Sequence, residues 1–233
     1  MKQKEDRLDA LITIVDYSYG NTLNDLFKKV NIPISLITHG YGSAKSEVYD
    51  ILGFSPKKII AVSVVKDEES TPILNKLRSK LSFDKKGTGI AFTIRMSSVS
   101  SHLHNLYKQS EINLELEREA KDMEAKDEYS LIIAIVDTGH FDGVMDAAKR
   151  AGASGGTLVH ARGLGSKEAE KFLGITIQPE KDVVLILAPK EKKSEIMQSI
   201  TKEVGLNTEG RGICFSLPVN DTVGLIETTK ELS

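Results

Sequence analysis

Two glycine pairs flanked by basic side chains have the types and spacing that favour ligand chemistry. Gly163 and Gly165 lie between Arg162 and Lys167, whereas Gly210 and Gly212 enclose Arg211. Glycine allows left-handed backbone and close approach to a ligand, and successive exposed N–H groups in such a turn bind anions. Basic side chains add charge-assisted hydrogen bonds. The pattern predicts an anion-binding site, although the same glycines would also serve as tight turns with no ligand.

The first half of the chain carries the same pairs. Gly40 with Gly42 and Gly87 with Gly89 precede their counterparts by 123 residues, and Ile12–Asp16 precedes Ile133–Asp137 by 121. Collinear matches at a nearly constant offset indicate two copies of one module, over residues 7–96 and 129–224. The predicted ligand-binding residues of the two copies are Gly40, Gly42, Gly87, Gly89, Arg162, Gly163, Gly165, Lys167, Gly210, Arg211 and Gly212.

Other polar residues favour simpler roles. Asp16 and Asp137 align at the end of the first strand, where helix-cap or turn positions are more typical than acid–base catalysis. His39 and His160 do not align between the copies. His102 and His104 lack further metal ligands nearby and are interpreted as solvated side chains.

The elements that position these residues are clearer in the second copy. Apolar β-branched runs predict strands at 131–136, 157–161, 182–188 and 213–219, and helical spacing predicts helices at 141–151 and 189–204. The order β-α-β-β-α-β is the ferredoxin-like arrangement, with both helices on one sheet face. The fold class predicted is α+β, with two tandem domains at 1–98 and 129–233 and a helical connector at 99–128. Another module is expected to cover the opposite sheet face, which favours an oligomer.

This order of elements, together with Val159–Gly165 and Gly210–Phe215, resembles the PII nitrogen-regulatory signalling proteins, more closely in the second copy. The resemblance implies a trimeric, non-enzymatic protein that binds ATP, ADP or another adenine nucleotide between subunits and senses 2-oxoglutarate. It also implies signalling to target proteins through the loop after the second strand. Ile213 and Ile90 depart from the family pattern, which has lysine there, and Pro218–Asp221 replaces the family's phosphate-binding arginines.

Composition narrows the functional classes. The 233 residues include 33 acidic and 31 basic side chains, which argues against a nucleic-acid binder. No apolar run approaches the roughly 20 residues of a membrane span, and the N-terminus is too charged for a signal peptide. Cys214 alone excludes a disulfide framework and a multi-cysteine metal site, and it is expected to behave as a small hydrophobe. A cytoplasmic location is the simplest expectation.

The sequence predicts a PII-like regulatory protein that binds a small anionic metabolite at module interfaces and modulates a protein partner. We expect a homotrimer, or a dimer if the two copies pair within the chain. The alternative is a structural or metal-responsive trimeric module of the same fold without a nucleotide site. An enzyme is the weaker possibility, because no catalytic motif is evident.

Overall fold

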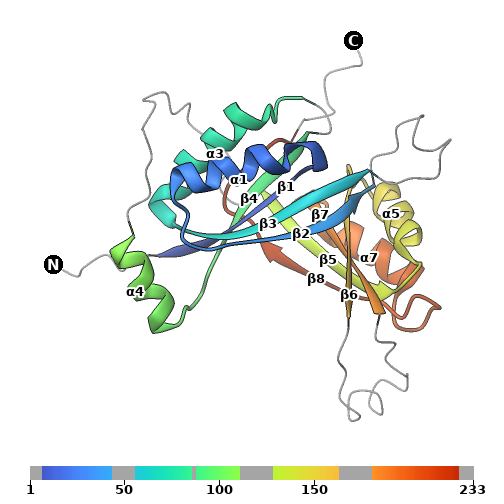
Figure 1. Cartoon of the computed structure of the whole chain (residues 1–233). Helices are drawn as coiled ribbons and strands as arrows, with labels where there is room; N and C mark the ends of the chain where they lie inside the picture. The colour runs from blue at the N-terminus through green and yellow to red at the C-terminus, as the bar shows by residue number, and fades with distance from the viewer. Residues whose placement is uncertain (1–6, 44–55, 86–87, 111–127, 163–179, 226–233) are drawn as a thin grey trace. The chain divides into compact units, whose positions relative to one another are not determined.

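A computed structural model describes residues 7–43, 56–85, 88–110, 128–162 and 180–225 (Figure 1). The chain divides into two compact units. Unit 1 comprises residues 1–39, 57–128 and 218–233, and unit 2 comprises residues 40–56 and 129–217. The exchanged segments, 40–56 and 218–233, each belong to the unit formed by the other half of the chain.

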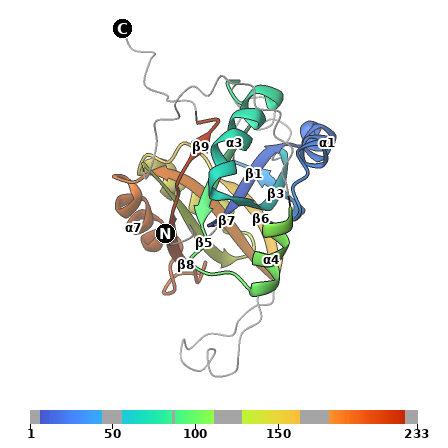
Figure 2. The same ribbon diagram turned by 90° about the vertical axis from the view of Figure 1, so that its left-hand side faces the viewer.

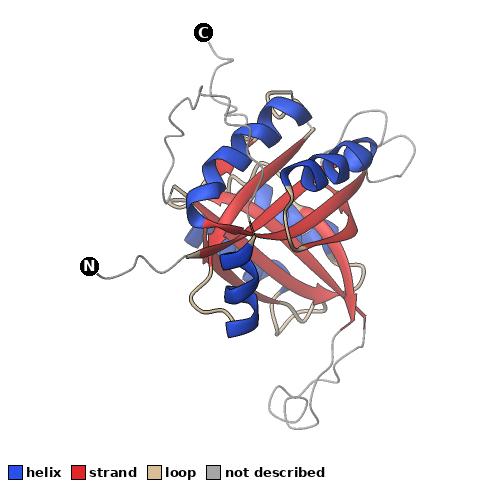
Figure 3. Cartoon of the chain, turned by 60° about the vertical axis from the view of Figure 1, so that its left-hand side comes forward, coloured by secondary structure: helices blue, strands red, loops and turns tan. Residues whose placement is uncertain are grey.

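Unit 1 contains an antiparallel sheet with the strand order β2-β3-β1-β4-β9. Helices α1 and α3 lie side by side over one face of this sheet (Figure 3). The last residues of β2, Gly40–Gly42, are counted with unit 2. The elements are β1 (Leu8–Asp16), the 3-10 turn η1 (Tyr17–Tyr19), α1 (Gly20–Val30), β2 (Ser35–Gly42), β3 (Lys57–Lys66), α3 (Asp67–Leu81), β4 (Gly89–Arg95), α4 (Ser101–Gln109) and β9 (Thr222–Val223).

Unit 2 has the matching strand order β6-β7-β5-β8, in which the strands correspond to β2, β3, β1 and β4 of unit 1. Leu8 pairs with Lys66 in unit 1 and Tyr129 with Pro189 in unit 2, so the registers follow the same offsets of 121 and 123 as the sequence. The predicted α+β, ferredoxin-like fold is therefore confirmed. Its elements are β5 (Tyr129–Asp137), α5 (Phe141–Arg150), β6 (Thr157–Arg162), β7 (Glu180–Pro189), α7 (Lys193–Val204) and β8 (Ile213–Pro218).

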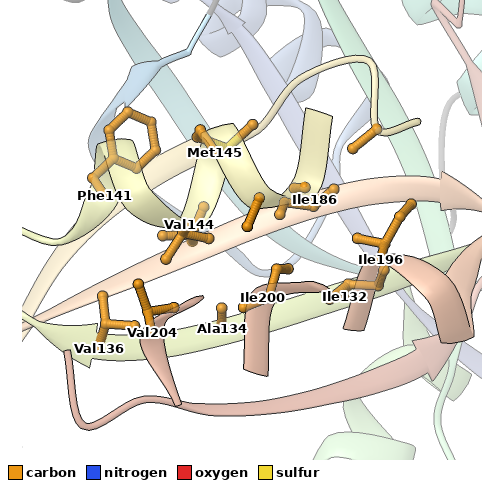
Figure 4. Packing of buried hydrophobic residues seen from close by; sticks show 14 of the residues in the cluster. Ile132, Ala134, Val136, Phe141, Val144, Met145, Ile186, Ile196, Ile200 and Val204 are labelled. Atoms are coloured by element: carbon orange, nitrogen blue, oxygen red, sulfur yellow. The ribbon is translucent and has the colours of Figure 1, made fainter. Parts of the chain in front are cut away.

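The core of unit 2 lies between its sheet and its two helices (Figure 4). Alternate residues of β5, Ile132, Ala134 and Val136, are buried against Val144 of α5 and Ile200 of α7. This alternation is the period of two expected for a strand with one face on the core. The predicted start of the second helix at Pro189 is wrong, because Pro189 still pairs with Tyr129 in β7 and the helix begins at Lys193.

The other face of β8 is apolar and accessible. Ile213, Phe215 and Leu217 are 46%, 41% and 36% exposed, whereas Cys214 between them packs against the core of unit 2. The expectation that another module covers this face stays a prediction.

The predicted connector begins as a helix. Ser100 caps α4 by accepting a hydrogen bond from the Leu103 amide, 3.3 Å away. Tyr107 is fully buried and its hydroxyl donates to the Val64 carbonyl at 2.6 Å. Burial raises the pKa of Tyr107 to about 12. This contact anchors α4 to unit 1, and residues 111–127 of the connector lie outside the described part of the chain. Among the described helices, none combines the length and apolar character needed to cross a bilayer.

We expect Cys214 to be unreactive in the folded protein. Burial raises the pKa of its thiol to about 11, against an ordinary value of 9.0. The thiolate is the nucleophile, so two pKa units mean about 100-fold less reactive species at neutral pH. Alkylation by iodoacetamide, followed by mass spectrometry, should be slow in native buffer and fast in denaturant. Rapid alkylation of the native protein would contradict the burial of this side chain.

Candidate functional site

Arg162 and the second glycine pair, Gly210 and Gly212, lie at the same end of the sheet of unit 2. Asp137 at the end of β5 pairs with Lys181 of β7, and Lys181 pairs with Ala161 near the end of β6. Gly212 precedes β8, and Arg162 ends β6, which lies beyond β5 and β7 in the strand order. Three strand spacings separate these two strands, about 14 Å. Arg162 is accordingly not among the residues that line the cleft beside Gly212.

A cleft of about 640 Å³ opens at this end of unit 2, beside the second glycine pair. Its volume falls in the range of small-molecule sites. The turn after β5 provides one wall and the turn before β8 the other. The lining residues are Asp137, Thr138, His140, Asn207, Thr208, Glu209 and Arg211.

The glycine pair beside the cleft is a tightly packed turn. Arg211 has a left-handed backbone, with φ of 44°. Its amide donates to the Thr208 carbonyl at 3.2 Å, and the Gly212 amide donates to the Val204 carbonyl at 2.7 Å. These two N–H groups are committed within the protein, so they do not form the anion-binding turn that the glycines suggested. Donors for an anion must then come from side chains, above all the Arg211 guanidinium.

Charges around the cleft are mixed. Arg211, Asp137 and Glu209 all line it. Asp137 is ion-paired with Lys181, and only 10% and 12% of these two side chains are exposed. Because Lys181 balances Asp137, the charges that face a ligand are mainly those of Arg211 and Glu209.

The same aspartate–lysine pair occurs in unit 1. Lys58 Nζ lies 3.5 Å from Asp16 Oδ2, and Lys58 precedes Lys181 by the repeat offset of 123. Asp16 also accepts hydrogen bonds from the amide and hydroxyl of Ser18, which confirms its predicted capping role. Burial alone would raise the pKa of Asp16, but the Ser18 hydrogen bonds and the Lys58 charge outweigh it and lower the pKa.

The structure brings only part of the predicted set to the cleft. Arg211 lines it, with Gly210 and Gly212 on either side. Arg162 is exposed at the end of β6, and Gly40 and Gly42 are buried at the end of β2 beside β6. Gly89 begins β4, where a Cβ atom would lie 2.4 Å from the Ile14 carbonyl oxygen. The remaining four, Gly87, Gly163, Gly165 and Lys167, lie outside the described residues, and ligand contact stays a prediction for the whole set.

Most of the cleft lining was not predicted. Thr138, His140, Asn207, Thr208 and Glu209 belong to turns with no periodic pattern. The available signal was their position next to residues that were singled out, Asp137 and Arg211. Lys58 and Lys181 had a stronger signal, because the repeat offset relates them in the same way as the glycines.

Comparison with known proteins relates the second half of the chain to one family. Three solved structures are similar to this chain over part or most of its length. A PII protein of Arabidopsis thaliana bound to citrate is 21% identical and covers 40% of this chain and 77% of its own, with a TM-score of 0.32. A GlnK–ATP complex of B. subtilis is 14% identical and covers 40% and 85%, with a TM-score of 0.31. An unknown protein of Galdieria sulphuraria is 13% identical and covers 92% and 99%, with a TM-score of 0.27.

No curated protein matches the chain. The family model described as nitrogen regulatory protein P-II matches residues 129–229. These residues include all of β5 to β9 and both walls of the cleft. The second half of the chain, residues 129–229, is thus similar to the nitrogen regulatory protein P-II family.

Proposed function

We propose that this chain is a PII-like regulatory protein that binds a small anionic metabolite in the cleft of unit 2 and thereby changes its affinity for a protein partner. The observation that carries the proposal is the Arg211 side chain, which lines a metabolite-sized cleft in the P-II module. A guanidinium recognises carboxylate or phosphate through paired hydrogen bonds. The cytoplasm is its proposed location and signalling, not catalysis, its proposed role.

The charge balance limits what the cleft binds alone. Arg211 and Glu209 together contribute no net charge, so a ligand with one or two acidic groups suits it better than a free triphosphate. An adenine nucleotide needs further cations. Arg162 does not line the cleft of its own unit, and a second module is the natural source. The proposed site for a nucleotide therefore lies between modules of a homo-oligomer, with Arg211 from one and Arg162 from another.

Calorimetric titration with ATP, ADP, citrate and 2-oxoglutarate tests this function. Replacing Arg211 with alanine should weaken binding of the recognised ligand about 10- to 100-fold, because a hydrogen bond to a charged group contributes about 1.5–3 kcal/mol. Arg162→Ala should weaken nucleotide binding similarly if two modules share the site. Arg78→Ala, an exposed arginine of α3, is the matched control and should bind normally. The proposal fails if none of the four ligands binds at millimolar concentration, or if Arg211→Ala binds as tightly as the wild type.

One observation favours the alternative of a structural module without a ligand. The Arg211 and Gly212 amides are already bonded within the turn. In that case the titrations would be silent, and light scattering would still report an oligomer of the 25.6 kDa chain. The metal-responsive version has no support in the described residues, which contain no group of three metal-binding side chains.

A further inference from the structure

Asp182 is a charged residue in the interior of unit 2. It lies on β7 and is only 2% exposed. Its Oδ1 lies 2.9 Å from Nδ1 of His160 on β6, and its Oδ2 accepts a hydrogen bond of 3.0 Å from the Gly139 amide. Because a carboxylate only accepts, the first contact assigns a proton to Nδ1 of His160. One side chain thus ties β6 and β7 to the turn after β5.

That turn forms one wall of the cleft. Gly139 stands between Thr138 and His140, both of which line the cleft. Gly139 has φ of 97°, and no atom beyond its two chain neighbours lies within 4 Å of where its Cβ would be. Within the turn the His140 amide donates to the Asp137 carbonyl at 3.4 Å, and the shorter bond from the Gly139 amide to Asp182 ties the turn to β7.

Unit 1 closes the corresponding turn without a buried charge. The repeat offsets place Ser18 at the position of Gly139, Ile59 at that of Asp182 and Ile37 at that of His160. The Ser18 amide bonds to the neighbouring Asp16 side chain at 3.1 Å, and Ile59 is 7% exposed in the core. Burying a carboxylate costs free energy that an apolar residue avoids. The fold does not require the Asp182–His160 pair, so its presence in the P-II module calls for another reason.

We propose that Asp182 is a positioning residue of the cleft, which holds the Thr138–His140 wall and links it to the end of β6 through His160. His160 is two residues before Arg162, so the link runs from the end of β6 to the cleft beside Gly210 and Gly212. Among the described residues, Tyr41 of β2 also lies near His160, with ring centroids 5.6 Å apart, and the Asp137–Lys181 ion pair occupies the next register position. The effect on a ligand rests on the proposed function, whereas the positioning of the turn does not.

Amide hydrogen exchange of Gly139, measured by NMR on the full chain, tests the positioning without any ligand. Asp182→Ile installs the residue that unit 1 uses. We expect this variant to fold with wild-type or higher thermal stability and to exchange the Gly139 amide at least 10-fold faster. Asp182→Asn keeps an acceptor for this amide and should restore protection. Unchanged protection in folded Asp182→Ile would overturn the proposal.

His160 provides a second, milder test that does not depend on Asp182→Ile folding. Because His160 is 59% exposed, His160→Phe should fold, leave Asp182 with one partner fewer, and increase Gly139 exchange about threefold. His160→Asn retains a donor near the Nδ1 position and should stay close to wild type. His39→Phe in unit 1 is the matched control, because His39 also contacts a tyrosine ring, that of Tyr17 at 5.7 Å. Equal Gly139 exchange in His160→Phe and His39→Phe would contradict the link.

Titration with ATP and with citrate separates this proposal from the proposed function. Asp182→Ile should weaken binding of whichever probe the wild type binds about 5- to 10-fold, and Asp182→Asn less than twofold. Wild-type affinity in Asp182→Ile would overturn a role for Asp182 at the cleft. If the wild type binds neither probe at millimolar concentration, the proposed function loses its support, while Gly139 exchange still decides whether Asp182 positions the turn.

Discussion

Deleting residues 218–233 is expected to destabilise unit 1, although this segment follows the last strand of the second repeat. Val223 and Thr222 pair with Ala91 and Phe92 of β4, and the amides of Asn220 and Thr93 donate to the carbonyls of Thr93 and Asp221. Figure 2 shows the short strand β9 in dark red. Val219 and Val223 are 1% and 5% exposed. Burying a valine side chain contributes about 1.5–3 kcal/mol, so the truncation should cost unit 1 about 3–5 kcal/mol.

Hydrogen exchange with mass spectrometry can report on each unit separately. Peptides from β1 and β4 should lose protection in the truncated chain, whereas peptides from β5 and β7 should keep it. A chain that ends at Leu225 retains β9 and is the matched control. Val219→Ala with Val223→Ala should reproduce part of the effect without shortening the chain. Loss of protection confined to unit 2 would contradict the assignment of this segment to unit 1.

The repeated core elements were predictable because their signals are local. The apolar run Leu131–Val136 lies wholly within β5, and helical spacing from Phe141 onward corresponds to α5. The offset between the copies also carried over directly into strand register, since β1–β3 and β5–β7 pair in the same way. Each of these features depends on neighbouring residues or on a repeat that the sequence displays.

Features that depend on distant partners were not predictable in this way. Nothing in residues 218–224 indicates that they pair with β4, because an edge strand of two residues has no periodic pattern. Pro189 was assigned to a helix, and only its pairing with Tyr129 extends β7 through it. The contact between His160 and Asp182 joins two strands separated in sequence by residues 163–179. The first copy has Ile37 at the position of His160, so the repeat did not mark this histidine.

Paired glycines in a sequence are typical both of ligand-binding turns and of positions where neighbouring backbone atoms exclude a side chain. Close packing explains Gly212, whose Cβ would lie 2.4 Å from the Val204 carbonyl oxygen and 2.8 Å from Val136 Cγ1. Gly89 at the start of β4 meets the Ile14 carbonyl oxygen at the same distance. A side chain is therefore excluded at both positions by backbone atoms, whether or not a ligand binds nearby. Ligand chemistry in the cleft must be sought in the side chains that the turn presents, and not in its glycines.

Gly212→Ala should accordingly destabilise unit 2 strongly. The Gly212 amide donates to the same Val204 carbonyl that the new methyl group would strike, so the turn must move and lose this bond. Overpacking costs about 1–3 kcal/mol and a lost hydrogen bond about 1 kcal/mol, which gives about 2–4 kcal/mol in chemical denaturation followed by hydrogen exchange in β5 and β7.

Two matched variants test whether the loss of stability in Gly212→Ala comes from close packing. Gly155→Ala meets only Ser43 Oγ at 3.5 Å, an ordinary contact, and should change the stability of unit 2 by less than about 0.5 kcal/mol. Gly89→Ala should reproduce the effect of Gly212→Ala in unit 1, with protection lost in β1 and β4. If Gly212→Ala is as stable as the wild type, the turn has room to spare and its glycines remain available for a ligand. If the effect is as large as expected in both units, the repeated glycines are explained by the close approach of two backbones, and the Arg211 side chain is left as the feature of this turn that a metabolite would recognise.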